Sequence, residues 1–363
     1  MLSRMKVFGL CFLLSAGVGF SQSEKIDAKL KEYIADAEKA GFSGSVLVAV
    51  KDKILLSSGY GMAVRDEDIP FTKDTVSSIG SITKQFTGAA VLKLQKMGKL
   101  NIQDSITKYF QNVPEDKKDI TLHHLLTHTA GFPGAIGHDF DPVDRDEFIQ
   151  EVQHTELLRK PGTLYEYSNV GYSLLGIIIE LVSGKSYEEF LNEHLFAPAG
   201  MKRTGYLMPE WDKAVLAHGY RGGSDWGTLL DHPWLDDGPG WHLRGNGGIL
   251  STVGDMYKWQ KALKGDSILG EEEKKLYYHP HVREGEDADS FYGYGWALFT
   301  TPRDTKLVAH NGGNPYFSAD FLRYVDEDVV IIVLANTSGY RAWQISEGLA
   351  KVVFPKLPAA SFR

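Results

Sequence analysis

Residues 75–98 read TVSSIGSITKQFTGAAVLKLQKMG, and this stretch decides the fold. Its first part is strand-like, and the mostly apolar run that follows predicts a helix closed by Gly98. Ser81 and Lys84 stand three residues apart where the helix opens, so they lie on one face, one turn apart. Backbone N–H groups and the positive end of the helix dipole at this point suit a developing oxyanion.

The same four letters, SITK, occur a second time at residues 105–108. There they stand in LNIQDSITKYFQNVPED, a short amphipathic piece with Asp104 as a natural helix cap and Pro114 soon after. We expect Ser105 to be a first-turn helix residue and Lys108 to be solvated. Because a bare S-x-x-K is a weak signal, only the surroundings can separate the two copies.

The composition is that of a globular protein with one large domain or two ordinary ones. The chain has 363 residues, of which 43% are hydrophobic, enough for a substantial core. Lys and Arg number 39 against 47 Asp and Glu, which gives a formal net charge of -8. No segment carries a block of basic residues, so we expect no nucleic-acid partner.

The first residues predict a signal peptide at 1–21. Arg4 and Lys6 precede an uncharged apolar run that is too short to span a bilayer, and small residues at 19 and 21 suit cleavage after Ser21. A retained N-terminal anchor is the alternative. Cleavage removes Cys11, the only cysteine, and makes the net charge -10. We therefore expect an exported protein, periplasmic or secreted, with no disulfide, no cysteine-bound metal and no stable membrane span after processing.

The order of the predicted elements indicates an α+β fold. A helix at 24–40 and two strands within 44–61 come first, residues 100–250 are helices and long loops, and strands and a last helix follow. This order predicts an antiparallel sheet built from N- and C-terminal segments, flanked by helices, with an inserted mostly helical domain. We place the sheet domain at 22–98 and 251–363 and the inserted domain at 99–250.

Two further motifs follow Ser81 and Lys84 in the chain. EYSNVGY carries Tyr-Ser-Asn at 167–169, and VAHNGGNP carries His-Asn-Gly-Gly at 310–313. With these motifs the chain resembles the serine β-lactamase and penicillin-binding-protein superfamily, within it the class C β-lactamase, D-aminopeptidase and esterase branch. LLTHTAGFP and GNGGILSTVGDMYKW are similar to two more segments of that branch, and KLNIQDSITKYF fits a structural helix in it. The third motif departs from the superfamily's Lys-Thr-Gly, since His310 stands in place of lysine.

The resemblance implies a catalytic role for three residues. Ser81 is the nucleophile, and Lys84 is the base that takes its proton if burial lowers the pKa of the lysine. Tyr167 acts either as an anion polarised by Lys84 or as a proton relay to the leaving group. The alternative for Tyr167 is a tyrosine at the edge of the core.

Four more residues are expected to bind the substrate or the oxyanion: Asn169, His310, Gly312 and Gly313. The resemblance gives Asn169 the orientation of Lys84 and a hydrogen bond to the substrate, with a plain helix cap as the alternative. It places the oxyanion hole at the N–H groups of Ser81 and Gly313. His310 is mostly neutral at pH 7, so we expect weaker carboxylate capture than a lysine gives. Alternatively, His310 is bonded to Tyr167 and does not touch the substrate.

These inferences predict an exported serine hydrolase that cleaves an ester or amide through an acyl-enzyme on Ser81, with no cofactor. Its partner is a small-molecule or peptide substrate. Two alternatives stay open. One is a D-aminopeptidase, or a D,D-peptidase or β-lactamase, acting on cell-wall peptides or β-lactams. The other is a binding or sensor module that is acylated without turnover.

Two other clusters suggest metal sites, and neither fits well. His124 and His128 have the i, i+4 spacing of zinc ligands but lack the glutamate of H-E-x-x-H. The aspartates of 139–146 lack the glycine and final glutamate of a calcium-binding loop. We therefore predict structural histidines, a solvated acidic loop and no metal.

Overall fold

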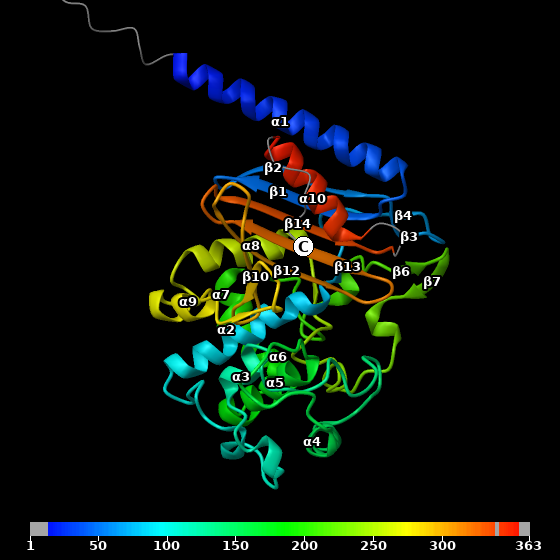
Figure 1. Cartoon of the computed structure of the whole chain (residues 1–363). Helices are drawn as coiled ribbons and strands as arrows, with labels where there is room; N and C mark the ends of the chain where they lie inside the picture. Colours follow the sequence, from blue (N-terminus) through cyan, green and yellow to red (C-terminus); the bar gives the residue numbers. More distant parts are fainter. Residues whose placement is uncertain (1–13, 338–340, 356–363) are drawn as a thin grey trace, which may run out of the picture.

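The computed structural model describes residues 14–337 and 341–355 (Figure 1). The predicted signal peptide begins in residues 1–13, which lie outside the described residues. The first helix, α1 (Leu14–Lys39), starts earlier than the residue 24 that the charge pattern predicts. None of the described helices combines the length and the apolar character that crossing a membrane requires.

An antiparallel eight-stranded sheet is the centre of the fold, in the order β2-β1-β14-β13-β12-β11-β10-β9. Its strands are β1 (Gly44–Val50), β2 (Lys53–Tyr60), β9 (Val282–Arg283), β10 (Ser290–Tyr292), β11 (Ala297–Thr300), β12 (Lys306–Gly313), β13 (Ser318–Tyr324) and β14 (Val329–Ala335). β1 pairs with β14, with Gly44 opposite Ala335, so the two ends of the chain join in one sheet. The predicted α+β fold is confirmed.

The sequence of β14, VVIIVLA, explains how the layers stack. All seven residues are buried, which is typical of a strand covered on both faces. Val329, Ile331 and Val333 pack with α1 and α10 (Ala342–Val353), whereas the residues between them pack into the main core. Figure 1 shows α1 and α10 on one side of the sheet and the other helices on the opposite side.

The remaining helices lie, with the mostly apolar helix α2 (Thr83–Lys96), on the side of the sheet opposite α1 and α10 (Figure 1). They are α3 (Leu122–Leu126), α4 (Arg145–His154), α5 (Asn169–Ser183), α6 (Tyr187–Leu191), α7 (Ala197–Ala199), α8 (Val253–Lys264) and α9 (Glu271–Tyr277). Among them, α5, α6 and α9 pack against α2. α3 ends before His128, whose φ is +57°, so His124 and His128 do not share one helix as their i, i+4 spacing suggests. One continuous core joins these helices to the sheet, so the domain boundaries at 98 and 250 stay a prediction.

A small pairing outside the large sheet positions the site. β5 (Ser77–Ser78) pairs with β8 (Leu250–Ser251), with Ser78 opposite Leu250. This pairing holds the segment before Ser81 beside a loop far along the chain. Of the strand-like letters TVSSIG, only these two residues form a strand.

Candidate active site

Ser81 lies in the short turn η1 (Gly80–Ile82), directly before α2. Gly80 has a φ of +50°, and a Cβ on it would lie 2.2 Å from the backbone nitrogen of Gly313. Only glycine allows this approach, so the turn packs backbone against backbone at the end of β12. Ser81 is half-buried in the wall of a cavity of about 700 Å³. We call it the serine cavity; it is lined by Ser81, Tyr167, Arg221, Asn311, Gly313 and Arg341, among others.

Lys84 is fully buried one turn after Ser81, with 0% of its surface exposed. Its Nζ donates to Ser81 Oγ at 3.1 Å, to Asn169 Oδ1 at 2.8 Å and to the carbonyl oxygen of Asn246 at 2.9 Å. Burial lowers the pKa of Lys84 to about 7, against a small opposing effect of Asp139. A large fraction of Lys84 is therefore an uncharged amine at neutral pH, which can accept the Ser81 proton.

Tyr167 stands over Lys84, with the ring centroid 4.9 Å from Nζ. Burial raises the pKa of Tyr167 above its ordinary value, although a hydrogen bond with Ser81 opposes the shift. Tyr167 is therefore a neutral phenol at pH 7. Of the two roles that the sequence left open, this charge state favours the proton relay over the tyrosinate anion.

His128, which the sequence suggested only as a structural histidine, supports the Tyr167 ring. The two ring centroids are 4.3 Å apart, and His128 is 2% exposed. The backbone N–H of Ser168 donates to Nδ1 at 3.0 Å, so Nε2 carries the proton of the neutral ring. Burial and the nearby Lys84 hold the pKa of His128 well below its usual value. His128 thus presents an uncharged face to Tyr167.

Asn169 is the first residue of α5, and its side chain accepts from Lys84. The alternative of a plain helix cap is wrong, because the residue at the cap position is Ser168. The Ser168 hydroxyl donates to the carbonyl of Pro133 at 2.6 Å, which ties the start of α5 to a neighbouring loop.

Asn246, which received no role from the sequence, supplies the third acceptor for Lys84. Its amide group donates to Ser173 Oγ and to the carbonyl of His242, both at 2.8 Å, and these bonds orient its backbone. The surrounding sequence, GNGGILS, is a glycine-rich stretch without periodicity, which indicates a loop but no particular residue in it. A backbone carbonyl leaves no side-chain signature, so its role could not be predicted.

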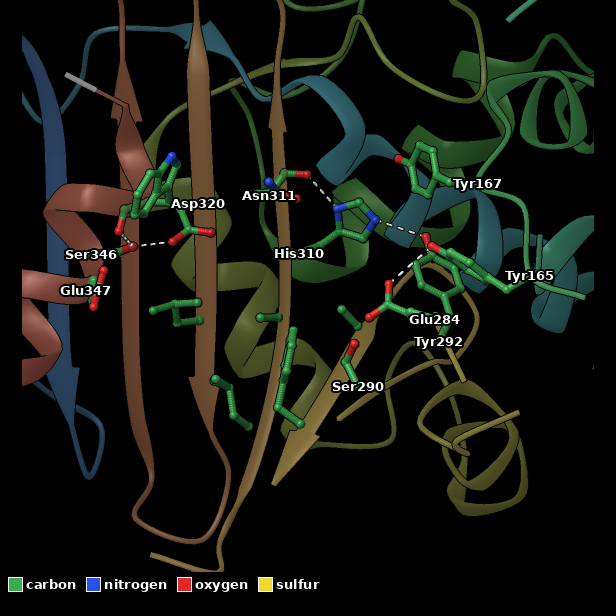
Figure 2. Close-up of a pocket in the computed structure, with 16 residues that line it drawn as sticks. Tyr165, Tyr167, Glu284, Ser290, Tyr292, His310, Asn311, Asp320, Ser346 and Glu347 are labelled. Carbon is green, nitrogen blue, oxygen red and sulfur yellow. Dashed lines mark hydrogen bonds between the residues drawn. The ribbon is translucent and has the colours of Figure 1, made fainter. Parts of the chain in front are cut away.

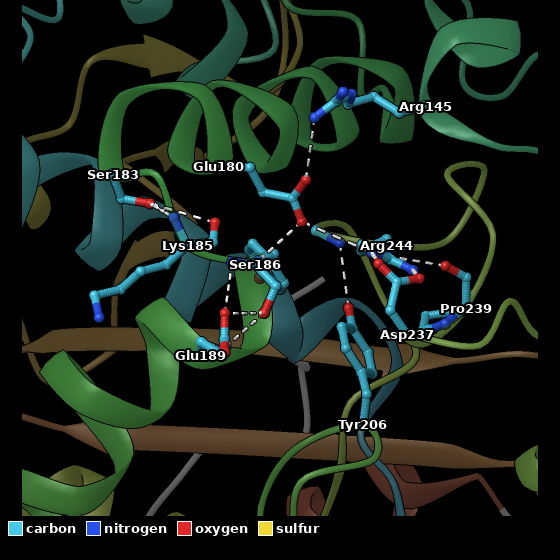
Figure 3. A network of polar contacts seen from close by, with 12 residues as sticks. Arg145, Glu180, Ser183, Lys185, Ser186, Glu189, Tyr206, Asp237, Pro239 and Arg244 are labelled. Carbon is cyan, nitrogen blue, oxygen red and sulfur yellow. Dashed lines mark hydrogen bonds and ion pairs between the residues drawn. The ribbon is translucent and has the colours of Figure 1, made fainter.

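A buried arginine anchors the loop that carries Asn246 (Figure 3). Arg244 donates to both carboxylate oxygens of Asp237, at 2.8 and 2.6 Å, and lies 3.7 Å from Glu180 of α5. On the other side, the Tyr206 hydroxyl accepts from Gly245 N at 3.2 Å and donates to the carbonyl of Gly247 at 2.7 Å. Bonds on both sides of Asn246 therefore hold its carbonyl in place.

Gly312 and Gly313 form the end of β12 beside Ser81. A Cβ on Gly312 would lie 2.1 Å from the carbonyl oxygen of Ile79 and 2.6 Å from the backbone nitrogen of Ser81. Together with the close approach of Gly80 to Gly313, this brings the Ser81 and Gly313 amides to one junction at the serine cavity. Two neighbouring N–H groups are the arrangement that an oxyanion hole needs.

His310 is 5% exposed and is engaged within the protein. Nδ1 lies 2.6 Å from the carbonyl oxygen of Asn311, which can only accept, so Nδ1 carries the proton. In the neutral ring, Nε2 then accepts from the hydroxyl of Tyr292 at 3.0 Å. The alternative of a hydrogen bond between His310 and Tyr167 is wrong, because the tyrosine bonded to His310 is Tyr292. The ring centroids of Tyr167 and His310 are 6.5 Å apart.

The second SITK lies at the surface, away from these groups. Ser105 caps the turn η2 (Ile106–Lys108), and its Oγ accepts from Thr107 N at 3.1 Å. The expectation of Asp104 as the cap is wrong; Asp104 instead accepts from Lys108 Nζ at 2.7 Å. The solvated state predicted for Lys108 is confirmed, because its side chain is 56% exposed.

The two suggested metal clusters have other contacts. His128 Nδ1 accepts from the backbone, as described above, and His124 Nδ1 accepts from the backbone of Thr121. In the 139–146 loop, Asp144 caps α4 and Asp141 accepts from the backbone of His138. Within residues 14–337 and 341–355 no group of three or more His, Cys, Asp or Glu side chains is placed to hold a metal ion.

Comparisons with known proteins identify the family. The family model described as Beta-lactamase matches residues 26–347. The chain is 30% identical over 320 residues to penicillin-binding protein 4* of Bacillus subtilis (strain 168), covering 82% of this chain and 69% of that protein. It is also 30% identical over 318 residues to Protein flp of Staphylococcus aureus (strain MW2), covering 83% of this chain and 61% of the relative.

A solved structure gives the same result for the fold. The octameric penicillin-binding protein homologue from Pyrococcus abyssi aligns with a TM-score of 0.80 and 29% identity, over 91% of this chain and 78% of that chain. The similarity therefore covers both the sheet and the helices around α2.

Proposed function

Because this chain belongs to the Beta-lactamase family, within the serine β-lactamase and penicillin-binding-protein superfamily, we propose that it is an exported serine hydrolase that cleaves an ester or amide through a Ser81 acyl-enzyme. The observation that carries the proposal is the hydrogen bond of 3.1 Å between Ser81 Oγ and the buried Nζ of Lys84. A serine hydroxyl is a poor nucleophile until a neighbouring base takes its proton. An amine with a pKa of about 7 is a suitable base near neutral pH.

In the proposed first step, Ser81 Oγ bonds to the substrate carbonyl carbon while its proton passes to Lys84 Nζ. The carbonyl oxygen becomes an oxyanion, which the Ser81 and Gly313 N–H groups stabilise. As the bond to the leaving group breaks, Tyr167 gives its hydroxyl proton to the departing oxygen or nitrogen. The proton held on Lys84 then returns to Tyr167.

In the second step a water molecule hydrolyses the acyl-enzyme. Lys84, again uncharged, accepts the proton of the water as its oxygen attacks the acyl carbon. The bond to Ser81 Oγ breaks, the serine regains a proton, and the acid product leaves. Asn169 and the Asn246 carbonyl keep Lys84 oriented throughout, since both accept from Nζ.

The test combines turnover with covalent labelling. Purified protein without residues 1–21 is mixed with a p-nitrophenyl ester and, separately, with a fluorophosphonate probe. We expect p-nitrophenol release and one mass adduct on Ser81, both absent in Ser81→Ala and both retained in the matched control Ser105→Ala. Neither turnover nor an adduct on Ser81 in the folded protein would overturn the proposal. An adduct without turnover would favour the acylated sensor.

A peptidase is the second candidate, and one observation favours it. Arg221 and Arg341 line the serine cavity, where they would attract a carboxylate on the acyl side of a peptide or similar substrate. His310 does not add to this attraction, since both of its ring nitrogens are bonded within the protein. Faster hydrolysis of a carboxylate-bearing D-amino-acid amide than of a simple ester would promote this candidate.

A further inference from the structure

A second hollow adjoins the serine cavity on the face of the sheet that carries α10. We call it the outer groove. It has a volume of about 400 Å³, within the range of small-molecule sites, about 300–1,000 Å³. The two hollows share Tyr167 and Asn311 in their linings. Figure 2 shows the groove with the strands as its floor, Ser346 and Glu347 of α10 on one side, and Tyr165, Tyr292 and Glu284 on the other.

The floor of the outer groove is apolar and contains small residues where the strands meet. Ala297 of β11 stands directly opposite Ala309 of β12, which in turn stands opposite Leu322 of β13. Phe299 and Leu307 form the next pair along the same two strands. Larger side chains at the two alanines would fill this space, so the pair of alanines creates the hollow.

The two hollows carry opposite charges. The described part of the outer groove is lined by the carboxyl groups of Glu284, Asp320 and Glu347, and no lysine or arginine is among these lining residues. Lys351 of α10 pairs with Glu347 at 3.0 Å, and burial raises the pKa of Glu284, so the acidic character of the groove is weaker than three free carboxylates would give. The serine cavity instead has Arg221 and Arg341, with no acidic residue among its described lining. A substrate bound at Ser81 therefore meets a cationic region on one side of Tyr167 and an apolar, acidic region on the other.

The position of Tyr167 decides which part of the substrate faces the groove. The oxyanion amide of Gly313 belongs to the serine cavity, and Asn314 and Pro315 continue that wall. The group that departs must lie within reach of the Tyr167 hydroxyl, and the outer groove begins at that tyrosine. Since Tyr167 lines both hollows, an orientation with the acyl part in the serine cavity and the leaving group in the groove satisfies both constraints.

We propose that the outer groove binds the leaving group and selects apolar alcohols or amines, accepting a terminal ammonium and rejecting a terminal carboxylate. This inference rests on the proposed function and narrows it. It argues against release of a free amino acid by a carboxypeptidase reaction, because that leaving group carries a carboxylate. The leaving group of an alkyl or aryl ester, or of an amide of an apolar amine, is compatible with both the apolar floor and the acidic walls of the outer groove.

The first experiment varies the leaving group at a constant acyl group. Methyl, butyl and octyl esters of one acid are compared by kcat/KM. Burial of each added methylene should raise kcat/KM about threefold to fourfold until the groove is full. Varying the acyl chain at a constant leaving group serves as the comparison and should have a smaller effect.

The second experiment fills the groove. Ala309→Leu and the less buried Ala297→Leu should both reduce the octyl-to-methyl ratio of kcat/KM by about tenfold or more. Thr300→Leu is the matched control, since it adds the same side chain on β11 outside the lining residues. Thermal melting and the Ser81 fluorophosphonate adduct verify that each variant is folded with an intact site.

The third experiment tests the charge. An ester with a terminal ammonium on its leaving group should be turned over at least about tenfold faster than the matched carboxylate ester. Glu347→Gln removes one groove carboxylate and leaves Lys351 without its partner, so it should reduce this preference severalfold. Equal turnover of the two esters would overturn the charge selection.

The outcomes separate this inference from the proposed function. A protein that turns over esters and labels at Ser81 but ignores leaving-group length and Ala309→Leu would overturn the groove alone. If Ala309→Leu instead removed a dependence on acyl length, the orientation of the substrate would be reversed. No turnover and no adduct would overturn the proposed function itself.

Discussion

The two SITK segments have identical letters and opposite surroundings. In the first, Lys84 is fully buried and its Nζ bonds to Ser81, Asn169 and the carbonyl of Asn246. In the second, Lys108 is mostly exposed and pairs with Asp104, a contact of a kind that contributes little to stability. A lysine acts as a base near pH 7 only when burial removes its hydration without providing a carboxylate partner. The fold, and not the tetrapeptide, makes this difference.

The largest expected difference between the copies is in the nucleophile. Ser81→Ala should lower kcat/KM for a p-nitrophenyl ester by at least about 10³-fold, because no other hydroxyl is bonded to Lys84 in the described structure. Steady-state kinetics and intact-protein mass spectrometry after fluorophosphonate treatment measure the loss. Activity above one tenth of the wild-type value would mean that Ser81 is not the nucleophile.

Substitutions of the two lysines should differ in their effects on the turnover rate and on its pH dependence. Lys84→Ala should reduce kcat about 10²- to 10⁴-fold, whereas Lys108→Ala should be neutral. In the wild type, kcat/KM should rise as the pH increases through about 7, because the reactive form of Lys84 is the uncharged amine. A pH–rate profile from 5 to 9 measures this limb, which Lys108→Ala should leave in place. A flat profile would contradict the assignment of Lys84 as the base.

The same buried lysine predicts the sign of a pH effect on stability. Its pKa is lower in the folded state than in the unfolded chain, so between about 7 and its ordinary value the unfolded state binds more protons. The contribution of Lys84 to folding therefore becomes more favourable as the pH rises through that window. Lys84→Met should remove this slope, which denaturant unfolding at several pH values can measure. An unchanged slope would show that other groups cause it.

Tyr167 is a further difference between the two SITK segments, because no tyrosine hydroxyl is bonded to Ser105 in the described chain. Tyr167→Phe should lower kcat about 10²-fold for an alkyl amide, whose leaving nitrogen needs a proton. The loss should be much smaller for a p-nitrophenyl ester, whose leaving group departs as an anion. Parallel kinetics on the two substrates give the ratio. Equal losses would indicate that Tyr167 only positions Ser81.

Much of the fold was predictable because the relevant signals are local. Apolar runs in the sequence predict the helix α2 and the strand β14. Gly41 marks the end of the helical periodicity of α1. The start of α1 and the early end of α3 were not predictable in this way. At α3 the left-handed backbone of His128 ends a pattern whose side chains still read as helical.

The residues of the candidate site likewise fall into those with a local sequence signal and those without one. Ser81, Lys84, Tyr167 and Asn169 belong to short motifs, so their types and order could be read from the sequence. Asn246 acts through its carbonyl, and His128 through the face of its ring, so neither has a recognisable motif. The outer groove depends on which alanines stand opposite each other across two strands, and only the register of the sheet reveals this.

Arg244 supports the first SITK through the loop that carries Asn246. Arg244→Met should lower the free energy of unfolding by about 3 kcal/mol, because it takes away the arginine that lies 3.7 Å from the mostly buried carboxylate of Glu180 and also breaks the ion pair with the more exposed Asp237. If the Asn246 carbonyl shifts, the acidic limb of the pH–rate profile should shift as well. Chemical denaturation and the pH profile together test both effects. A purely structural role would change stability and leave the pH profile where it is.

The smallest expected effect belongs to Ser105. Ser105→Ala should leave kcat/KM unchanged, since among the described residues its hydroxyl bonds to groups of its own surface loop alone, Thr107 and the carbonyl of Lys118. It should cost about 0.5–2 kcal/mol of stability, the usual range for a lost N-cap. The variant is therefore a demanding control, because it changes the same letter in the same tetrapeptide. If it abolished activity while the fold survived, the assignment of the two copies would be reversed.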